Sequence, residues 1–444
     1  MLSSQPAPLF GQWTTCIAAV LDCRSAPRFA FLLLGTILAK GRRTVTSWIR
    51  AAGIAAFFRP AYTALAAAGR RTDAIATTLV SQAILPLVPP LATRVVFAID
   101  DTPTARFGPK VRGAGVHHNP TPGPAGSAFV YGHVWVVLAL LATHPAWGCL
   151  ALPLLARLYV RQKDISSIPQ PDRPEFRTKL QMAVELLRWA AEQFERPGLT
   201  LWAVADGAYA AGQVLKEAKQ LGITVVSRLR KDCALHTLPE PRVKGQKGRP
   251  RIYGEKRIDL AKRAGQKRGW TEGKFTLYGK EMTKKYKSFP ATWEPAGGTI
   301  RVVLLCEEKG WVAFFCTDTS ATVADILGCV ADRFGIETAF REVKQQVGAG
   351  QQQVRKLAAN VGAFHACLWS YTLVEAWAWS RESSSLADRS DSPWDDATRR
   401  PSHADKRRAL RRELLAEEIK SAVRDGADEA KIGPAVERLL ALAA

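Results

Sequence analysis

The sequence predicts an α/β protein with a mixed β-sheet, preceded by a helical N-terminal region and interrupted by a basic, β-rich insertion. Three observations lead to this fold class. Helical patterning fills the first 90 residues, short β-branched apolar runs begin at residue 94, and a polar, basic segment punctuated by Gly and Pro begins at residue 232. The predicted organisation is a helical region at 1–90, an α/β domain at 91–231 and 299–380, the insertion at 232–298, and a linker with a C-terminal helix at 381–444.

The N-terminal region contains helix-like segments joined by a basic turn. Residues 29–39 are apolar and small, Arg42 and Arg43 follow, and further helix-like segments lie at 44–53 and 59–68. Short helices with basic residues at a turn are typical of modules that contact DNA. A helical cap packed on the next domain explains the same pattern, so both interpretations remain open.

The α/β domain is predicted from a change in hydrophobic periodicity after residue 90. Short apolar runs rich in β-branched residues indicate strands, and apolar residues recurring every three or four positions indicate helices. The expected elements are strands at 94–99, 129–142 and 148–160, a helix at 176–194, a strand at 200–205, a helix at 210–221, a strand at 223–227, a hairpin at 301–316 and a long helix at 322–347.

The charge composition favours an anionic polymer as partner. The 444-residue chain has 62 Lys and Arg against 40 Asp and Glu, a net charge of +22. More than half of this excess, +12, lies between Arg242 and Lys287, a segment with 16 basic and four acidic residues. A basic excess of this size suits polyphosphate, so we expect a nucleic acid to bind.

Other protein classes are disfavoured by the same sequence. The longest apolar run, residues 134–142, has nine residues, whereas a membrane span needs about 20. Residues 1–24 lack a basic start followed by an apolar core, so we expect no secretory signal. The eight cysteines form no CxxC pair, which disfavours a zinc site and is typical of free thiols in a reduced cytosol. We therefore expect a cytoplasmic protein that does not bind membranes.

Three acidic positions together suggest a metal site. Asp100 and Asp101 follow a predicted strand, Asp206 follows another, and Glu337 lies on a predicted helix. Carboxylates at strand ends, met by a helix with a third carboxylate, suit two Mg²⁺ or Mn²⁺ ions, which activate a water or 3′-hydroxyl and stabilise the leaving oxygen. Taken singly, each has an ordinary structural explanation, such as a turn cap, an Asp-Gly turn or a surface ion pair.

This combination resembles the DDE transposases of bacterial insertion sequences. The resemblance lies in residues 99–104 (IDDTPT), in residues 204–209 (VADGAY), and in the spacing of Arg333, Glu337 and Lys344. That spacing is the one in the Y-(2)-R-(3)-E-(6)-K signature of the family-four insertion sequences, although Val330 stands where the family has Tyr. The separation of 131 positions from Asp206 to Glu337 also leaves room for the β-rich insertion that such transposases carry.

The resemblance covers roughly residues 30–375 and implies an RNase H-like catalytic domain. Asp100, Asp206 and Glu337 would hold the metal ions; Asp101 remains an alternative to Asp100, which the family pattern Asp-x-Thr/Ser favours. The implied reaction is cut-and-paste transposition, in which a strand is nicked at the element end and the freed 3′-hydroxyl is joined to target DNA. The implied partners are double-stranded DNA, as element ends and target, and a second copy of the chain in a homodimer on DNA near the nucleoid.

Two other functions remain as alternatives: a catalytically silent DNA-binding protein derived from a transposase, and a metal-dependent nuclease unrelated to mobile elements. DNA contacts are expected from basic residues beside Glu337, after the strand at 223–227 and in a KGRPR segment, and from two tryptophans of the insertion, whose alternative role is a small core. The predicted contacts are Arg333, Arg341, Lys344, Arg228, Arg230, Lys247, Arg249, Arg251, Trp270 and Trp293.

Overall fold

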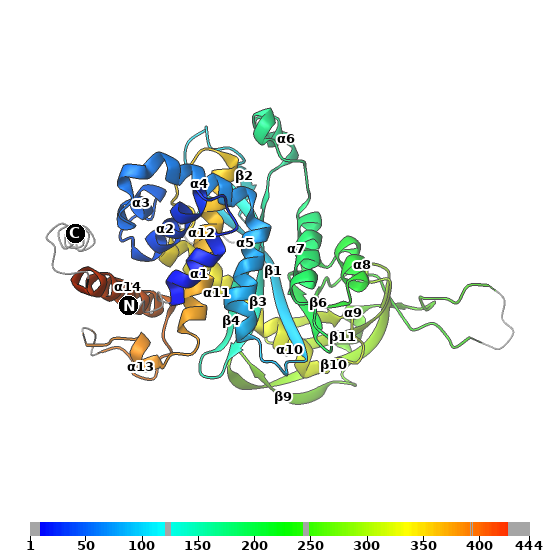
Figure 1. Ribbon diagram of the computed structural model, residues 1–444. Helices are drawn as coiled ribbons and strands as arrows, with labels where there is room; N and C mark the ends of the chain where they lie inside the picture. Colours follow the sequence, from blue (N-terminus) through cyan, green and yellow to red (C-terminus); the bar gives the residue numbers. More distant parts are fainter. Residues whose placement is uncertain (1–8, 120–125, 243–247, 391, 393, 425–444) are drawn as a thin grey trace.

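The computed structural model describes residues 9–119, 126–242, 248–390, 392 and 394–424 (Figure 1). The N-terminal region is helical, as predicted, and Thr44 caps the third helix by accepting a hydrogen bond from the Ser47 N–H. Its α-helices are α1 (Leu9–Ala18), α2 (Ser25–Leu38), α3 (Val45–Ala51), α4 (Phe58–Arg70) and α5 (Thr72–Leu79).

These helices pack around α12 (Leu357–Ala378), which is apolar on all sides and almost entirely buried. Two glycines allow α4 and α12 to touch backbone to backbone. A Cβ at Gly69 would lie 1.8 Å from the carbonyl oxygen of Ala358, and one at Gly362 would lie 2.0 Å from that of Leu65. The N-terminal helices are therefore joined closely to the helix that follows the segment from Arg333 to Lys344.

One twelve-stranded sheet runs through the rest of the described chain. In spatial order its main path is β2-β3-β1-β5-β6-β12-β11-β10-β7-β8, with β4 paired to β3 and β9 paired to β10. The strands are β1 (Arg94–Ala105), β2 (Gly115–His118), β3 (Phe129–His144), β4 (Gly148–Tyr159), β5 (Thr200–Ala205), β6 (Ile223–Leu229), β7 (Leu235–His236), β8 (Arg257–Ile258), β9 (Thr271–Leu277), β10 (Lys280–Trp293), β11 (Gly298–Glu307) and β12 (Gly310–Cys316).

The part of this sheet that carries the acidic residues is RNase H-like. β3 lies antiparallel between β1 and β4, while β1, β5 and β6 are parallel neighbours. The parallel strands are connected through α7 (Lys179–Gln193) and α8 (Gly212–Gln220), which lie side by side in Figure 1. The predicted fold class, a mixed α/β protein with a helical N-terminal region, is confirmed.

The basic segment is β-rich, as predicted, and its strands continue the main sheet. β10 pairs with β11, which pairs with β12, and β12 pairs with β6. The segment also contains the short helix α9 (Leu260–Gly265). Hydrogen bonds between these strands therefore connect the basic segment directly to the strand next to β5.

Two predicted elements differ in extent from those observed. β1 continues to Ala105 and pairs with β3 along this whole length, so Asp100 and Asp101 lie inside a strand and not at its end. The long helix expected at 322–347 is divided into α10 (Val323–Asp332), α11 (Phe334–Glu342) and a π-helical turn at Val343–Val347. Backbone hydrogen bonds with β3 thus continue β1 through Asp100 and Asp101, although both side chains are polar.

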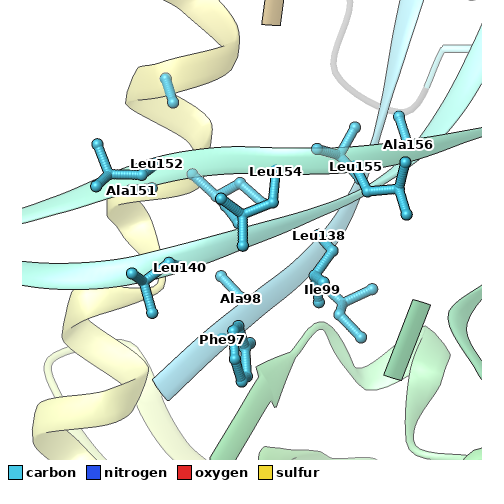
Figure 2. Close-up of a cluster of buried hydrophobic side chains, with 14 of the residues drawn as sticks. Phe97, Ala98, Ile99, Leu138, Leu140, Ala151, Leu152, Leu154, Leu155 and Ala156 are labelled. Carbon is cyan, nitrogen blue, oxygen red and sulfur yellow. The ribbon is translucent and has the colours of Figure 1, made fainter. Parts of the chain in front are cut away.

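The core is formed where β1, β3 and β4 face the helices. Figure 2 shows Phe97 and Ile99 of β1, Leu138 of β3, and Leu152 and Leu154 of β4 in one cluster, and all five are buried. Full burial of such a side chain contributes about 1.5–3 kcal/mol. The part of β1 that precedes Asp100 is therefore held rigidly by the packing of the core.

The C-terminal part of the described chain contains α13 (Ser383–Leu386) and α14 (His403–Arg424). The helix expected near the C-terminus is present, and it packs against α12 and α2 through ion pairs and hydrogen bonds. Within the described residues, no helix is both long enough and apolar enough to cross a membrane.

Candidate active site

Arg333 connects two of the three predicted carboxylates. It lies between α10 and α11, and its guanidinium donates to Asp100 Oδ2 at 2.8 Å and to Glu337 Oε1 at 2.9 Å. Asp100 comes from the middle of β1, and Glu337 lies in the first turn of α11. The fold therefore brings together residues that are more than 230 positions apart in the sequence.

Asp206 comes directly after β5, which is the parallel neighbour of β1. The parallel register pairs Ile99 of β1 with Ala205 of β5. Asp100 and Asp206 each come directly after one of these two residues, so they lie at the same level across the sheet. Asp206 is exposed, and its carboxylate has no hydrogen-bond or ion-pair partner among the described residues. The strand end thus presents a free carboxylate beside the pair that Arg333 holds.

Arg228 lies close to Asp206 on the next strand. Ala205 pairs with Ser227, and a Cβ added at Gly207 would approach the Arg228 carbonyl oxygen to 3.2 Å. The glycine after Asp206 therefore permits the close approach of the β6 backbone at this point. The Arg228 side chain is exposed, so a cation stands one strand away from the free carboxylate.

The electrostatics of Asp100 are unfavourable for a charged carboxylate. Burial raises the pKa of Asp100 to about 6, the Arg333 guanidinium opposes this shift, and the neighbouring Asp101 and Asp206 add to it. A further cation near Asp100 would favour its ionised form. Such a clustering of carboxylates around a raised pKa is typical of functional sites.

Asp101 has different partners on the other face of β1. Lys179 of α7 donates to its carboxylate at 2.6 Å, and the Tyr209 hydroxyl donates to it at 3.2 Å. Consecutive residues of a strand point to opposite faces, so only Asp100 points toward α11. Sequence reasoning missed both Lys179 and Tyr209, since neither lies in a motif with Asp101.

The two other basic residues predicted to contact DNA near Glu337, Lys344 and Arg341, differ in environment. Lys344 is partly buried, burial lowers its pKa to about 8, and its ammonium has no partner among the described residues. Arg341 is exposed and lies 3.8 Å from Glu342. Glu337 and Arg341 are one turn apart on α11, whereas Lys344 lies in the π-helical turn that follows.

The two tryptophans of the insertion that were predicted to contact DNA are buried or partly buried. Trp293 is 7% exposed and its ring packs edge-on against Phe315 at 5.1 Å. Trp270 is partly buried, with the Lys287 ammonium 4.8 Å from its ring centre. Both tryptophans therefore contribute to packing, which is the alternative that the sequence left open.

The basic loops of the insertion are exposed where they are described. Arg249 and Arg251 are exposed, and Arg251 pairs with Glu255. Arg230, just before the insertion, pairs with Asp232 at 3.0 Å. Lys247 lies outside the described residues.

An aromatic pair that the sequence analysis missed lies next to Arg333. Tyr278, in the β9–β10 turn, packs edge-on against Phe334 at 6.3 Å, and the two side chains are 62% and 52% exposed. Tyr278 has φ of 54°, the sole positive value for a non-glycine residue in the described chain. An exposed Tyr-Gly turn between two polar strands is the sequence signal that could have identified it.

A family model described as DDE superfamily endonuclease matches residues 17–293 of this sequence. The chain belongs to the DDE superfamily endonucleases. The match contains Asp100, Asp206 and β10, and it ends before Glu337. A search of curated proteins returned no significant match. As a DDE endonuclease, the protein is an enzyme that acts on DNA, and the RNase H-like part of the sheet agrees with that family.

DDE endonucleases normally use divalent metal ions. In the part of the chain that the structure describes, no three His, Cys, Asp or Glu side chains lie close enough together to form a preformed metal site. The donor chemistry nevertheless fits a hard cation, since Asp100, Asp206 and Glu337 offer carboxylate oxygens. The charge on Asp100 is also only partly balanced by Arg333, whose guanidinium holds the carboxylates of Asp100 and Glu337 together.

Proposed function

We propose that this DDE endonuclease is a transposase that cleaves and joins DNA strands at the ends of an insertion sequence. The observation that carries the proposal is the Arg333 guanidinium, which bonds to both Asp100 and Glu337 beside the exposed Asp206. The Arg333–Glu337–Lys344 spacing supports transposition over plain hydrolysis, because a nuclease has no need of this signature.

In this proposal Asp100, Asp206 and Glu337 hold two divalent ions, Mg²⁺ or Mn²⁺, and Asp101 stays bound to Lys179 and Tyr209. The ions supply activation of the attacking oxygen and stabilisation of the leaving oxygen. Arg333 orients Asp100 and Glu337 and adds fixed positive charge beside the phosphodiester, where negative charge develops in the transition state.

DNA binding is proposed for the exposed cations around the site and in the basic segment. Arg228 stands beside Asp206, Arg341 is exposed on the signature helix, and Arg249 lies in an exposed loop of the segment with a net charge of +12. Element ends and target DNA would both be bound in a homodimer assembled on DNA. Such binding weakens steeply with salt, because each neutralised phosphate releases counterions.

The test uses duplexes that carry the two flanks of the coding sequence, with a supercoiled plasmid as target. Wild-type protein with Mg²⁺ should produce a 3′-hydroxyl at the element end and then a product joined to the plasmid. Asp206→Asn and Glu337→Gln should abolish both steps and keep most DNA binding. Glu294→Gln is the matched control, since Glu294 is an exposed acid whose ion pair within the described residues is with Lys216.

The three functions give different results in this assay. Cleavage without joining would replace the transposase by a metal-dependent nuclease. Binding of the flanks without cleavage by the wild-type protein would indicate a silent derivative. Normal cleavage by either carboxylate variant would show that the residue was assigned wrongly.

A further inference from the structure

A positively charged cavity of about 360 Å³ lies beyond the end of β1, away from Asp100. Its volume is in the range of small-ligand sites. The lining residues come from two segments, 106–111 and 352–355, whose backbones are tied by a hydrogen bond from the Arg112 N–H to the Arg355 carbonyl. The lining contains the cations Arg106, Lys110 and Arg355, and none of its residues is acidic.

Arg106 is the buried member of this group, with 4% of its surface exposed. Its Nε donates to His133 Nδ1 at 3.0 Å. Its two terminal nitrogens are closed to solvent and have no hydrogen-bond partner among the described residues. A buried charge without an opposite partner costs several kcal/mol, so its presence requires a reason.

The groups around Arg106 do not neutralise it. His133 Nε2 donates to the Arg112 carbonyl at 3.0 Å, which leaves Nδ1 as the acceptor for Arg106. Burial and the adjacent Arg106 lower the pKa of His133 to about 3, so the ring is neutral. Burial raises the pKa of the Cys367 thiol to about 12, so this group is uncharged as well.

The rim of the cavity adds further positive charge. Lys110 and Arg355 are exposed and have no ion-pair partner in the described part of the chain. The Arg355 guanidinium offers planar, paired donors that match phosphate oxygens, and the Lys110 ammonium acts as a point charge. An incoming phosphate would meet the two rim cations first, and the buried Arg106 would favour an anion over a neutral group.

We propose that this cavity binds a backbone phosphate of the DNA substrate, at a distance from the reacting phosphodiester. The DNA identity of the ligand rests on the proposed function, whereas the phosphate chemistry rests on the cavity alone. Arg106 is six residues beyond Asp100 along one extended segment, which corresponds to about 20 Å at 3.3 Å per residue. That spacing matches about six nucleotides of a B-form strand.

The experiment compares wild-type protein with Arg106→Met, Arg106→Lys, Lys110→Ala and Arg355→Ala; Arg24→Met, at an exposed arginine far from the cavity in sequence, is the control. Melting temperatures are measured with increasing inorganic phosphate at constant ionic strength. Affinity for a duplex is measured over a range of salt concentrations, together with affinity for duplexes that carry single neutral methylphosphonates.

Phosphate should raise the melting temperature of the wild-type protein and have little effect on Arg106→Met, with Arg106→Lys in between. Arg106→Met should weaken DNA binding about tenfold or more and reduce the salt slope by about one. One methylphosphonate position should weaken wild-type binding and leave Arg106→Met unaffected. Lys110→Ala and Arg355→Ala should show smaller losses, and they report on the site even if Arg106→Met fails to fold.

A phosphate effect without any change in DNA affinity would overturn the DNA assignment and indicate a free phosphate ligand. Equal responses of wild-type protein, the rim variants and Arg24→Met would overturn the site altogether. The melting experiment requires no catalysis, so failure of the proposed transposase activity in Asp206→Asn or in the wild-type protein is distinguished from failure of this site.

Discussion

Asp100, which is partly buried, and Glu375, which is buried, have opposite electrostatic properties. Asp100 receives one guanidinium and has other carboxylates nearby, and its pKa is raised to about 6. Glu375 of α12 is 2% exposed and receives both the Lys406 ammonium at 2.5 Å and His403 Nδ1 at 2.8 Å. Burial acts to raise the pKa of Glu375 too, but Lys406 and His403 outweigh it and hold the pKa at about 2.

The two carboxylates differ in the charge of the groups that bind them, because Glu375 has an ammonium of its own whereas Asp100 shares one guanidinium. Both Glu375 oxygens are bound by groups of α14, so this cluster fixes the C-terminal helix to the core. Asp100 shares the Arg333 guanidinium with Glu337, and its other oxygen accepts from the uncharged Asp101 N–H at 2.8 Å. A carboxylate that is left partly unbalanced retains affinity for another cation, whereas a fully paired one does not.

The largest expected effect is on stability, at Glu375. Glu375→Gln leaves a buried Lys406 ammonium without its partner, and such a change costs about 3–5 kcal/mol. Chemical denaturation should show this loss, while DNA cleavage measured well below the melting temperature should stay near wild type. If the variant unfolded at the wild-type denaturant concentration, the contrast with Asp100 would be lost.

The next effect is on activity and pH dependence, at Asp100. Asp100→Asn should reduce cleavage by at least about a hundredfold, with Asp101→Asn as the neighbouring control. Because the folded pKa of Asp100 lies above its unfolded value, its favourable contribution is complete below about pH 4 and is lost as pH rises through 6. The loss is about 3 kcal/mol, so Asp100→Asn should melt increasingly above wild type between pH 4 and 7.

Glu375 gives the opposite pH profile. Its folded pKa lies below its unfolded value, so its contribution is present above about pH 4.5 and is lost as pH falls toward 2. A denaturation series from pH 7 to pH 3 should therefore show wild-type protein losing stability relative to Glu375→Gln. Parallel curves for the two proteins would contradict the paired state of this carboxylate.

A smaller effect is expected at Arg333. Arg333 is 23% exposed, its partner Glu337 is 45% exposed, and Asp100 can take up a proton when the guanidinium is removed, so Arg333→Ala should change stability by about 1 kcal/mol or less. Strand transfer should fall by about tenfold or more, since the variant loses both the orientation of the carboxylates and a fixed cation. Normal strand transfer with a lower melting temperature would assign Arg333 a structural role, like that of Lys406.

The smallest effect is expected at the aromatic pair beside Arg333. Tyr278→Gly relieves the positive φ at the β9–β10 turn, which favours stability by about 1 kcal/mol, and it also removes the contact with Phe334. Melting should change little, and DNA binding should weaken if the pair contacts DNA. Tyr278→Asn, which tolerates the same φ, controls for the backbone effect.

Much of the fold could be predicted from local sequence patterns. The strand and helix order, the β-rich basic segment and the helix near the C-terminus follow from hydrophobic periodicity and from turns, which depend on neighbouring residues. The signature likewise singled out Arg333 and Glu337, which are four residues apart and form an ion pair in the structure.

The sequence by itself determined the order of the main helices and strands, whereas pairing with β3 decided that Asp100 and Asp101 lie inside β1. The tertiary structure decided which partners these residues have: Arg333 for Asp100, Lys179 for Asp101, the core for Trp293, and Lys406 for Glu375. The physical reason is that such partners depend on strand register and helix docking over long sequence separations. Side-chain burial and charge balance follow from that packing, and no local pattern encodes them.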